Sequence, residues 1–191
     1  GGELLRDGID RELLADYGTF LKARPAKTML PKQIAECGTV QFGFMLDFGS
    51  FRDLQRHRAV TQRMPLITTE HGFAEWYFEE LPDNIRHNAE KLLTEQAEAI
   101  NKIKATPEEL QYYTAMGYEL PNRVTGDLSA WVHLVELRAT RFVHPTLRVK
   151  AAEIAKLLSE QYKEQSLAIH LDPDADRFGT GRGKHDIVQK N

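Results

Sequence analysis

The stretch from Thr39 to Arg63, TVQFGFMLDF-GS-FRDLQRHRAVTQR, decides how the fold is organised. Residues 39–48 are among the most apolar of the chain, and their β-branched and aromatic side chains in near-alternation predict a strand despite one glycine. Gly49-Ser50 then offers a break and a helix N-cap, so we expect residues 51–57 to form a short helix that leaves the strand.

The same stretch ends in a basic cluster. Five cationic or potentially cationic side chains fall within twelve residues: Arg52, Arg56, His57, Arg58 and Arg63. A basic cluster at the end of a buried element is costly unless an anion or a carboxylate meets it, so this is the first candidate ligand site. The alternative is an ordinary solvated helix face, with Arg52 and Arg56 one turn apart.

Composition limits the classes of protein that remain. The 191 residues suit one domain, and 41% apolar with 28% charged residues is the profile of a soluble globular protein. A net charge of -3 gives no support for wholesale nucleic-acid binding, and no window reaches the roughly 18 apolar residues of a membrane span. The single Cys37 excludes an internal disulfide. We therefore expect a cytoplasmic protein, and the start at Gly1-Gly2 without Met suggests a piece of a longer polypeptide.

The rest of the pattern is rich in helices and predicts an α+β fold, with helices packed on a small, mainly antiparallel sheet. We expect helices at 10–23, 83–104, 106–116, from 127 to a break at Pro145, and at 146–165, with a helical turn at 31–36. Residues 58–73 read as an extended loop or irregular strand, and Leu120-Pro121 as the start of a short connection. One domain is expected over residues 1–168, followed by a flexible tail at 169–191.

Several familiar site motifs fail on inspection. Residues 172–176 resemble the start of a calcium loop, but Arg177 stands where the loop needs glycine. Residues 179–184 have glycines and a lysine without the P-loop spacing. No His-Glu-x-x-His zinc motif and no Gly-x-Ser-x-Gly turn occurs, so we expect neither a metal nor a serine nucleophile. A second basic set remains, which either forms a surface stripe or joins the first cluster around an anion: Arg138, Arg141, His144 and Arg148.

Two segments together resemble the flavin-dependent thymidylate synthases, the ThyX family. One is Arg56-His57-Arg58; the other is the stretch 125–138, TGDLSAWVHLVELR, which matches that family's helix motif without a gap. Glu36 and Leu120-Pro121 also fall where the family has them, and the resemblance spans roughly residues 28–165. The matches within the second segment are Thr125, Gly126, Leu128, His133, Leu137 and Arg138.

The resemblance implies a ThyX-like fold and a reductive one-carbon transfer to C5 of dUMP or a related pyrimidine nucleotide. FAD would be the cofactor, with NADPH and methylenetetrahydrofolate as co-substrates, in a homotetramer whose sites lie between subunits. It implies that Arg138 is catalytic and stabilises charge on the pyrimidine, and that Arg56 and Arg138 contact the nucleotide. The residues that it implies for flavin binding are Arg56, His57, Arg58, Thr61, Glu36 and Asp127.

The chain departs from the family mainly on the nucleotide side. Leu66 replaces a serine beside the substrate, while Thr68 and Gly117 replace arginines that hold the nucleotide phosphate. Asp53 stands where a substrate-binding glutamine is usual, and Asp127 where the family has asparagine. Charge-assisted contacts contribute roughly 1.5–3 kcal/mol each, so these losses predict weaker binding of a dianionic nucleotide. Further replacements occur at Pro31, His144 and Thr146.

Three hypotheses follow. The chain is a ThyX-like flavoenzyme with rearranged nucleotide contacts; or it is a degenerate ThyX-like domain with a structural or regulatory role, such as one half of a tandem protein. The third is a helical module that binds nucleic acid or protein through its basic patches, against which the net negative charge counts.

Overall fold

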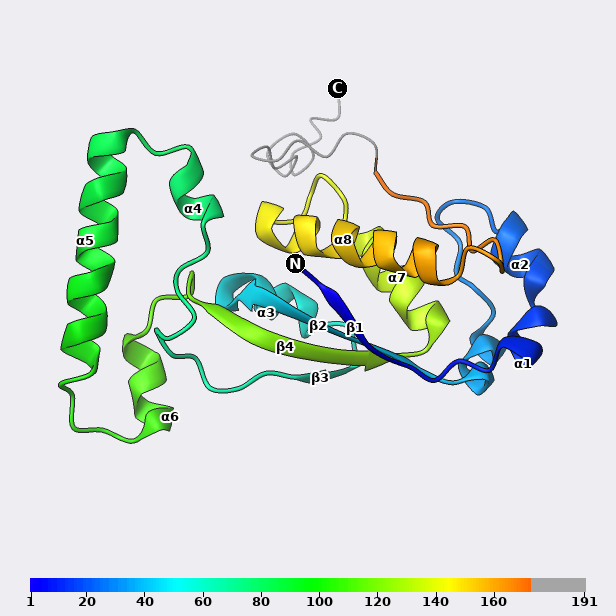
Figure 1. Ribbon diagram of the computed structural model, residues 1–191, viewed down its shortest axis with the longest axis horizontal. Helices are drawn as coiled ribbons and strands as arrows, with labels where there is room; N and C mark the ends of the chain where they lie inside the picture. The colour runs from blue at the N-terminus through cyan, green and yellow to red at the C-terminus, as the bar shows by residue number, and fades with distance from the viewer. Residues whose placement is uncertain (173–191) are drawn as a thin grey trace, which may run out of the picture.

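The central strand pair of the protein is β2 (Val40–Asp47) with β4 (Glu119–Gly126), antiparallel over eight residues of each. The computed structural model describes residues 1–172 and shows a four-stranded antiparallel sheet in the order β1-β2-β4-β3, with helices packed on it (Figure 1). This confirms the expected α+β class. The outer strands are β1 (Glu3–Asp7) and β3 (Thr61–Arg63).

The described helices and 3-10 turns, in chain order, are α1 (Arg11–Ala15), α2 (Gly18–Ala23), η1 (Lys32–Cys37), α3 (Phe48–Leu54), α4 (Trp76–Glu79), α5 (Asp83–Ile100), α6 (Pro107–Leu110), η2 (Gln111–Tyr113), α7 (Leu128–Arg138) and α8 (Pro145–Gln161). The helix expected at 10–23 is two helices, interrupted between Ala15 and Gly18.

Alternate residues of each strand point to the same side of the sheet, so the apolar side chains gather on one face, and helices cover that face. Phe42 of β2 is fully buried, and its ring meets the indole of Trp131 on α7 edge to face, with the ring centroids 4.9 Å apart. The Trp131 indole N–H also donates to the carbonyl of Val40 at 3.0 Å. Helices α7 and α8 lie over this face, and no helix within residues 1–172 covers the opposite face (Figure 1).

Two local predictions were wrong for identifiable reasons. Asp47, and not Ser50, caps α3, because its carboxylate accepts a hydrogen bond from the Ser50 backbone N–H at 3.0 Å; the helix therefore begins at Phe48. The stretch after Leu120-Pro121 is strand β4, not a connection. Because β3 pairs only with residues Arg123–Thr125, β4 is unpaired on that side at Pro121, a place where a sheet tolerates proline.

The segment from α4 to η2 forms an arm that extends beyond the sheet, with α5 standing apart from the other helices (Figure 1). Apolar side chains recur along one side of α5, but much of that side is open: Ile100 is buried, whereas Ile85 and Leu92 are exposed. A small cluster of Ile67, Tyr118 and Leu120 joins the arm to the sheet.

The C-terminal segment packs against α7 and the turn that follows it, as far as residue 172, the last that the structure describes. The backbone N–H of His170 donates to Glu136 at 2.8 Å, and Asp172 pairs with Arg141 at 2.7 Å, both beyond residue 168, where we placed the domain boundary. The remainder of the expected tail, including the calcium-like and glycine-rich motifs, lies outside the described residues. Within residues 1–172, no helix is long and apolar enough to cross a membrane.

Candidate functional site

The two segments that carry the family resemblance meet at the ends of α3 and α7. The Nε of Arg138, the last residue of α7, donates to Nε2 of His57 at 2.7 Å. A terminal nitrogen of the same guanidinium donates to the carbonyl oxygen of Asp53 in α3 at 2.8 Å. A guanidinium is always protonated, so His57 accepts through Nε2 and carries its own proton on Nδ1.

His57 is held neutral by this environment. Burial lowers the pKa of His57 to about 4, with further contributions from the positive charge of Arg138 and from the neighbouring His133. The rings of His57 and His133 lie with their centroids 6.0 Å apart. The pair therefore presents one fixed cation beside a neutral imidazole, an arrangement that stabilises negative charge on a bound ligand.

The two arginines that flank His57 are solvent-exposed. Arg56 lies 3.9 Å from the Asp53 carboxylate, a weak contact for a side chain that is 72% exposed. Arg58 is exposed in the turn after α3. Arg56 and Arg58 are therefore open to solvent on either side of His57, whereas His57 and Arg138 are bound to each other.

The other residues implied by the resemblance are spread along one end of the sheet. Thr61 begins β3 opposite Thr125 of β4, and Glu36 is exposed on η1, just before β2. Asp127 caps α7, because its carboxylate accepts from the Ala130 N–H at 2.9 Å. Since Val40 pairs with Gly126, the start of β2 and the end of β4 bring Glu36 and Asp127 to the same end of the sheet.

Only Arg138 of the second basic set joins the first cluster. Arg141 is held by a two-pronged ion pair with Asp172, with nitrogen–oxygen distances of 2.7 and 2.9 Å. Arg148 is 2% exposed. His144 contacts the Thr146 hydroxyl at 2.9 Å, in a buried polar group with Ser50 and Asp47.

Sequence reasoning missed several groups that shape the site. The backbone carbonyl of Asp53 and the ring of His133 had no signal that marked them as neighbours of His57. Gln62 also escaped notice: its side-chain amide donates to the carbonyls of Leu54 at 2.9 Å and His57 at 3.2 Å, which ties the basic turn to β3.

Two hollows adjoin these residues. One, of about 700 Å³, lies along the outer side of α7 and includes His133 and Leu137 with apolar side chains of Met29, Phe142 and Leu171. A smaller one, of about 270 Å³, lies on the uncovered face of the sheet beside Thr61 and Thr125. Within residues 1–172, no group of three or more His, Cys, Asp or Glu side chains is placed to hold a metal ion.

Two of the positions at which the chain departs from the ThyX sequences also have a distinct shape. A Cβ placed on Gly117 would lie 2.1 Å from Cζ of Phe73, so the Phe73 ring fills the space in which a side chain at residue 117 would begin. Leu66 is 40% exposed, an apolar surface where the family has a hydroxyl.

The chain is similar to two chlamydial proteins. It is 35% identical over 125 residues to a UPF0159 protein of Chlamydia pneumoniae, covering 63% of this chain and 23% of that protein. It is 32% identical over 156 residues to a UPF0159 protein of Chlamydia muridarum (strain MoPn / Nigg), covering 81% of this chain and 29% of that protein. The chain thus spans less than a third of the length of either curated relative. No family model matches the sequence.

Proposed function

We propose that this chain is a ThyX-like, flavin-binding domain that takes part in reductive one-carbon transfer to C5 of dUMP or a related pyrimidine nucleotide. One observation carries the proposal: Arg138 and His57, from the two segments that resemble the ThyX family, are in direct contact although 81 residues separate them. If the two segments resembled the ThyX family by chance, there would be no reason for them to meet in the folded chain.

The charged and apolar groups of this chain are of the kinds that bind a flavin, although one chain supplies only part of a site. Exposed Arg56 and Arg58 match the phosphates of FAD, and the hollow of about 700 Å³ along α7 has apolar walls and a size suited to part of a cofactor. Bound FAD would supply reducing equivalents taken from NADPH, and methylenetetrahydrofolate would supply the carbon. Arg138 would stabilise the negative charge that develops on the pyrimidine as C5 becomes nucleophilic, while neutral His57 keeps that guanidinium oriented.

A second copy of the chain, or a second ThyX-like domain of a longer protein, would complete the site. Both chlamydial relatives are more than three times as long as the segment that matches them, so there is room for such a domain in proteins of this kind. In this reading the protein acts as a homo-oligomer, such as a tetramer, or as a tandem of domains.

A degenerate domain with a structural or regulatory role is the second candidate. The packing of Phe73 against Gly117 favours it, because the phosphate-binding arginine of the family cannot be accommodated there without moving the ring. In this reading the chain keeps the flavin side, loses the nucleotide and supports a partner domain.

The visible absorption spectrum of the purified chain, before and after addition of FAD, tests the proposal. We expect a bound-flavin spectrum that is lost in Arg58→Ala and kept in Arg52→Gln, which removes an exposed arginine of α3. Release of tritium from C5-labelled dUMP then separates the two candidates: release supports the enzyme, and flavin binding without release supports the degenerate domain. A chain that stays colourless with FAD would remove both.

A further inference from the structure

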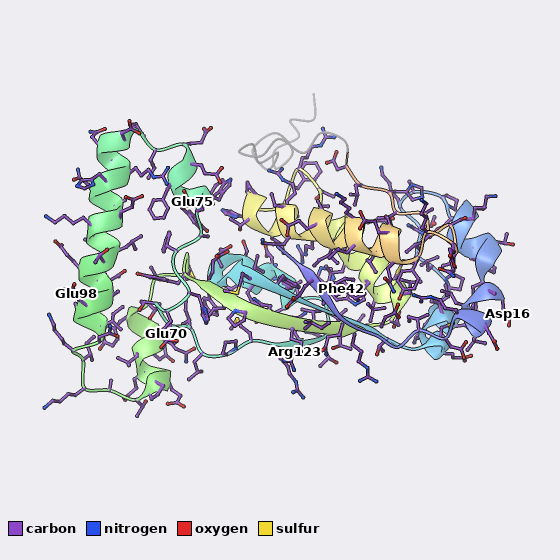
Figure 2. The ribbon with its side chains drawn as sticks, viewed as in Figure 1. Asp16, Phe42, Glu70, Glu75, Glu98 and Arg123 are labelled. Atoms are coloured by element: carbon purple, nitrogen blue, oxygen red, sulfur yellow. The ribbon has the colours of Figure 1, made fainter. Side chains whose placement is uncertain are left out.

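The uncovered face of the sheet carries two arginines directly opposite each other. Arg63 of β3 is the antiparallel partner of Arg123 of β4, and both side chains are exposed. Figure 2 shows Arg123 on the side of the sheet away from α7 and α8, whereas Phe42 lies on the helix side. Like charges directly opposite on a sheet destabilise the strand pair, so this pairing has a cost.

No carboxylate within the described chain offsets that cost. Neither Arg63 nor Arg123 forms an ion pair with any of residues 1–172. The nearby strand β1 contributes Glu3 to the adjoining hollow, but no ion pair links it to either arginine. Two unneutralised guanidinium groups on one rigid strand pair are suited to an anion that comes from outside the chain.

Hydrogen-bonding groups stand beside the arginines. Two residues along each strand, and therefore on the same face, Thr61 is paired with Thr125. Gln41 of β2 donates from its side-chain amide to the hydroxyl oxygen of Thr125 at 2.8 Å, which fixes that hydroxyl in place. These five side chains line the hollow of about 270 Å³.

A larger apolar hollow continues from the same arginines. It has a volume of about 570 Å³, includes Arg63 and Arg123, and has walls formed by Leu5, Met45 and Pro121. Gly43 at its floor has no side chain, and a Cβ there would lie 2.9 Å from Cδ1 of Leu5. The face therefore combines a cationic, hydroxyl-lined end with an apolar end, in the size range of small-ligand sites.

We propose that this face binds a nucleoside phosphate. Its phosphoryl oxygens would lie between Arg63 and Arg123, within reach of the threonine hydroxyls, and its ring would lie in the apolar hollow. Planar guanidinium groups bind phosphoryl oxygens in a two-pronged manner, which a pair of lysines would not reproduce. Neither arginine belongs to the flavin set, and the positions at which ThyX proteins hold the nucleotide phosphate are occupied by Thr68 and Gly117 instead.

The test uses the full 191-residue chain with ADP, pyrophosphate and adenosine as probes, measured by titration calorimetry at low salt. We expect ADP to bind at least tenfold more tightly than adenosine or pyrophosphate alone, since both hollows are then used. Arg63→Gln and Arg123→Gln should each weaken ADP binding at least tenfold, with little further loss in the double variant, because one phosphoryl group bridges both. Arg52→Gln removes the same charge from α3 and should leave binding unchanged.

Thermal unfolding supplies a second measurement, which does not depend on adenine being the base that the site prefers. Without added anion, each of the two variants should melt about 1–3 °C higher than the native chain, because the cross-strand repulsion is gone. Pyrophosphate should raise the melting temperature of the native chain and not that of the variants. Equal responses of native chain and variants to ADP and pyrophosphate would overturn the proposal.

Two further measurements distinguish this site from the proposed flavin site and from a nucleic-acid surface. Arg58→Ala should keep ADP binding, and Arg63→Gln should keep the flavin spectrum, so a failure of one site is distinguishable from a failure of the other. A different result would show that this face is a nucleic-acid surface and not a small-ligand site. In that case the affinity for single-stranded oligonucleotides would rise steadily with their length, and ADP would bind no more tightly than pyrophosphate.

Discussion

Arg138 donates a 2.7 Å hydrogen bond from its guanidinium Nε to the imidazole Nε2 of His57, and only a neutral imidazole can accept it. A protonated His57 could not accept that bond, and the two positive charges would repel each other. The first prediction follows from this relationship.

Stability should fall as the pH is lowered from about 6.5 towards 4. The pKa of His57 is lowered to about 4 by burial, Arg138 and His133, so between these values the unfolded chain takes up a proton that the folded chain does not. The loss should be about 1–2 kcal/mol after allowance for solvent screening of this partly exposed ring. Urea unfolding across pH 4–7 measures it. His57→Gln, which keeps an acceptor but cannot be protonated, should flatten this part of the profile, whereas His87→Gln on exposed α5 should not.

The ion pair between Arg24 and Glu136 should be sensitive to removal of either partner. The side chains are 3% and 14% exposed, and Arg24 also donates to the carbonyl of Ala168 at 3.0 Å. Glu136→Gln leaves a buried guanidinium without its counter-charge and should cost about 3–5 kcal/mol in the free energy of unfolding. Chemical denaturation measures this, with Glu95→Gln, which removes a carboxylate from an exposed ion pair on α5, as the control. A cost below about 1 kcal/mol would show that water reaches Arg24.

If the proposed function holds, an arginine placed at residue 117, as in ThyX proteins, should not by itself give the chain dUMP binding. Gly117→Arg would force the ring of Phe73 away from Tyr118, which it meets at a centroid distance of 5.2 Å, and should destabilise the fold by about 1–3 kcal/mol. The double variant Gly117→Arg with Phe73→Ala makes room for the new side chain. If residue 117 alone prevents nucleotide binding, dUMP should bind the double variant and not Phe73→Ala alone. If dUMP binds these two variants equally, the weak binding of dUMP is due to Leu66 and Thr68 instead.

The hydroxyl of Tyr77 should tie the arm to the body. It donates to the buried Asp47 carboxylate at 3.2 Å, and burial, with Asp47 beside it, raises the pKa of Tyr77 well above its usual value. Tyr77→Phe should leave the sheet intact and speed amide hydrogen exchange in residues 74–100. Asp47→Ala should also destabilise α3, by about 1–2 kcal/mol, because it removes the helix cap as well. Unchanged exchange in Tyr77→Phe would mean that the apolar cluster around Tyr118 holds the arm alone.

Much of the helical layer could be predicted from local pattern. The stripe of Leu128, Trp131, Val132 and Val135 is buried on α7 as its spacing indicates, and the capping box of Thr106 and Glu109 is present at the start of α6. The predictions failed where a distant partner decided the outcome. Strand β1 had no recognisable alternation, and forms because β2 offers it an edge. The apolar spacing along α5 indicates a core face, but within residues 1–172 Ile85 and Leu92 of that helix stay exposed.

For the site, the sequence by itself determined which side chains were candidates, because charge, hydrogen-bonding capacity and motif spacing are properties of the residues. It marked Arg56, His57, Arg58 and Arg138 in this way. Only the tertiary structure decided which of them touch, that His57 is neutral, and that Arg63 faces Arg123. Contacts across 60 or more residues depend on strand register and helix packing, which are set by burial summed over the whole chain.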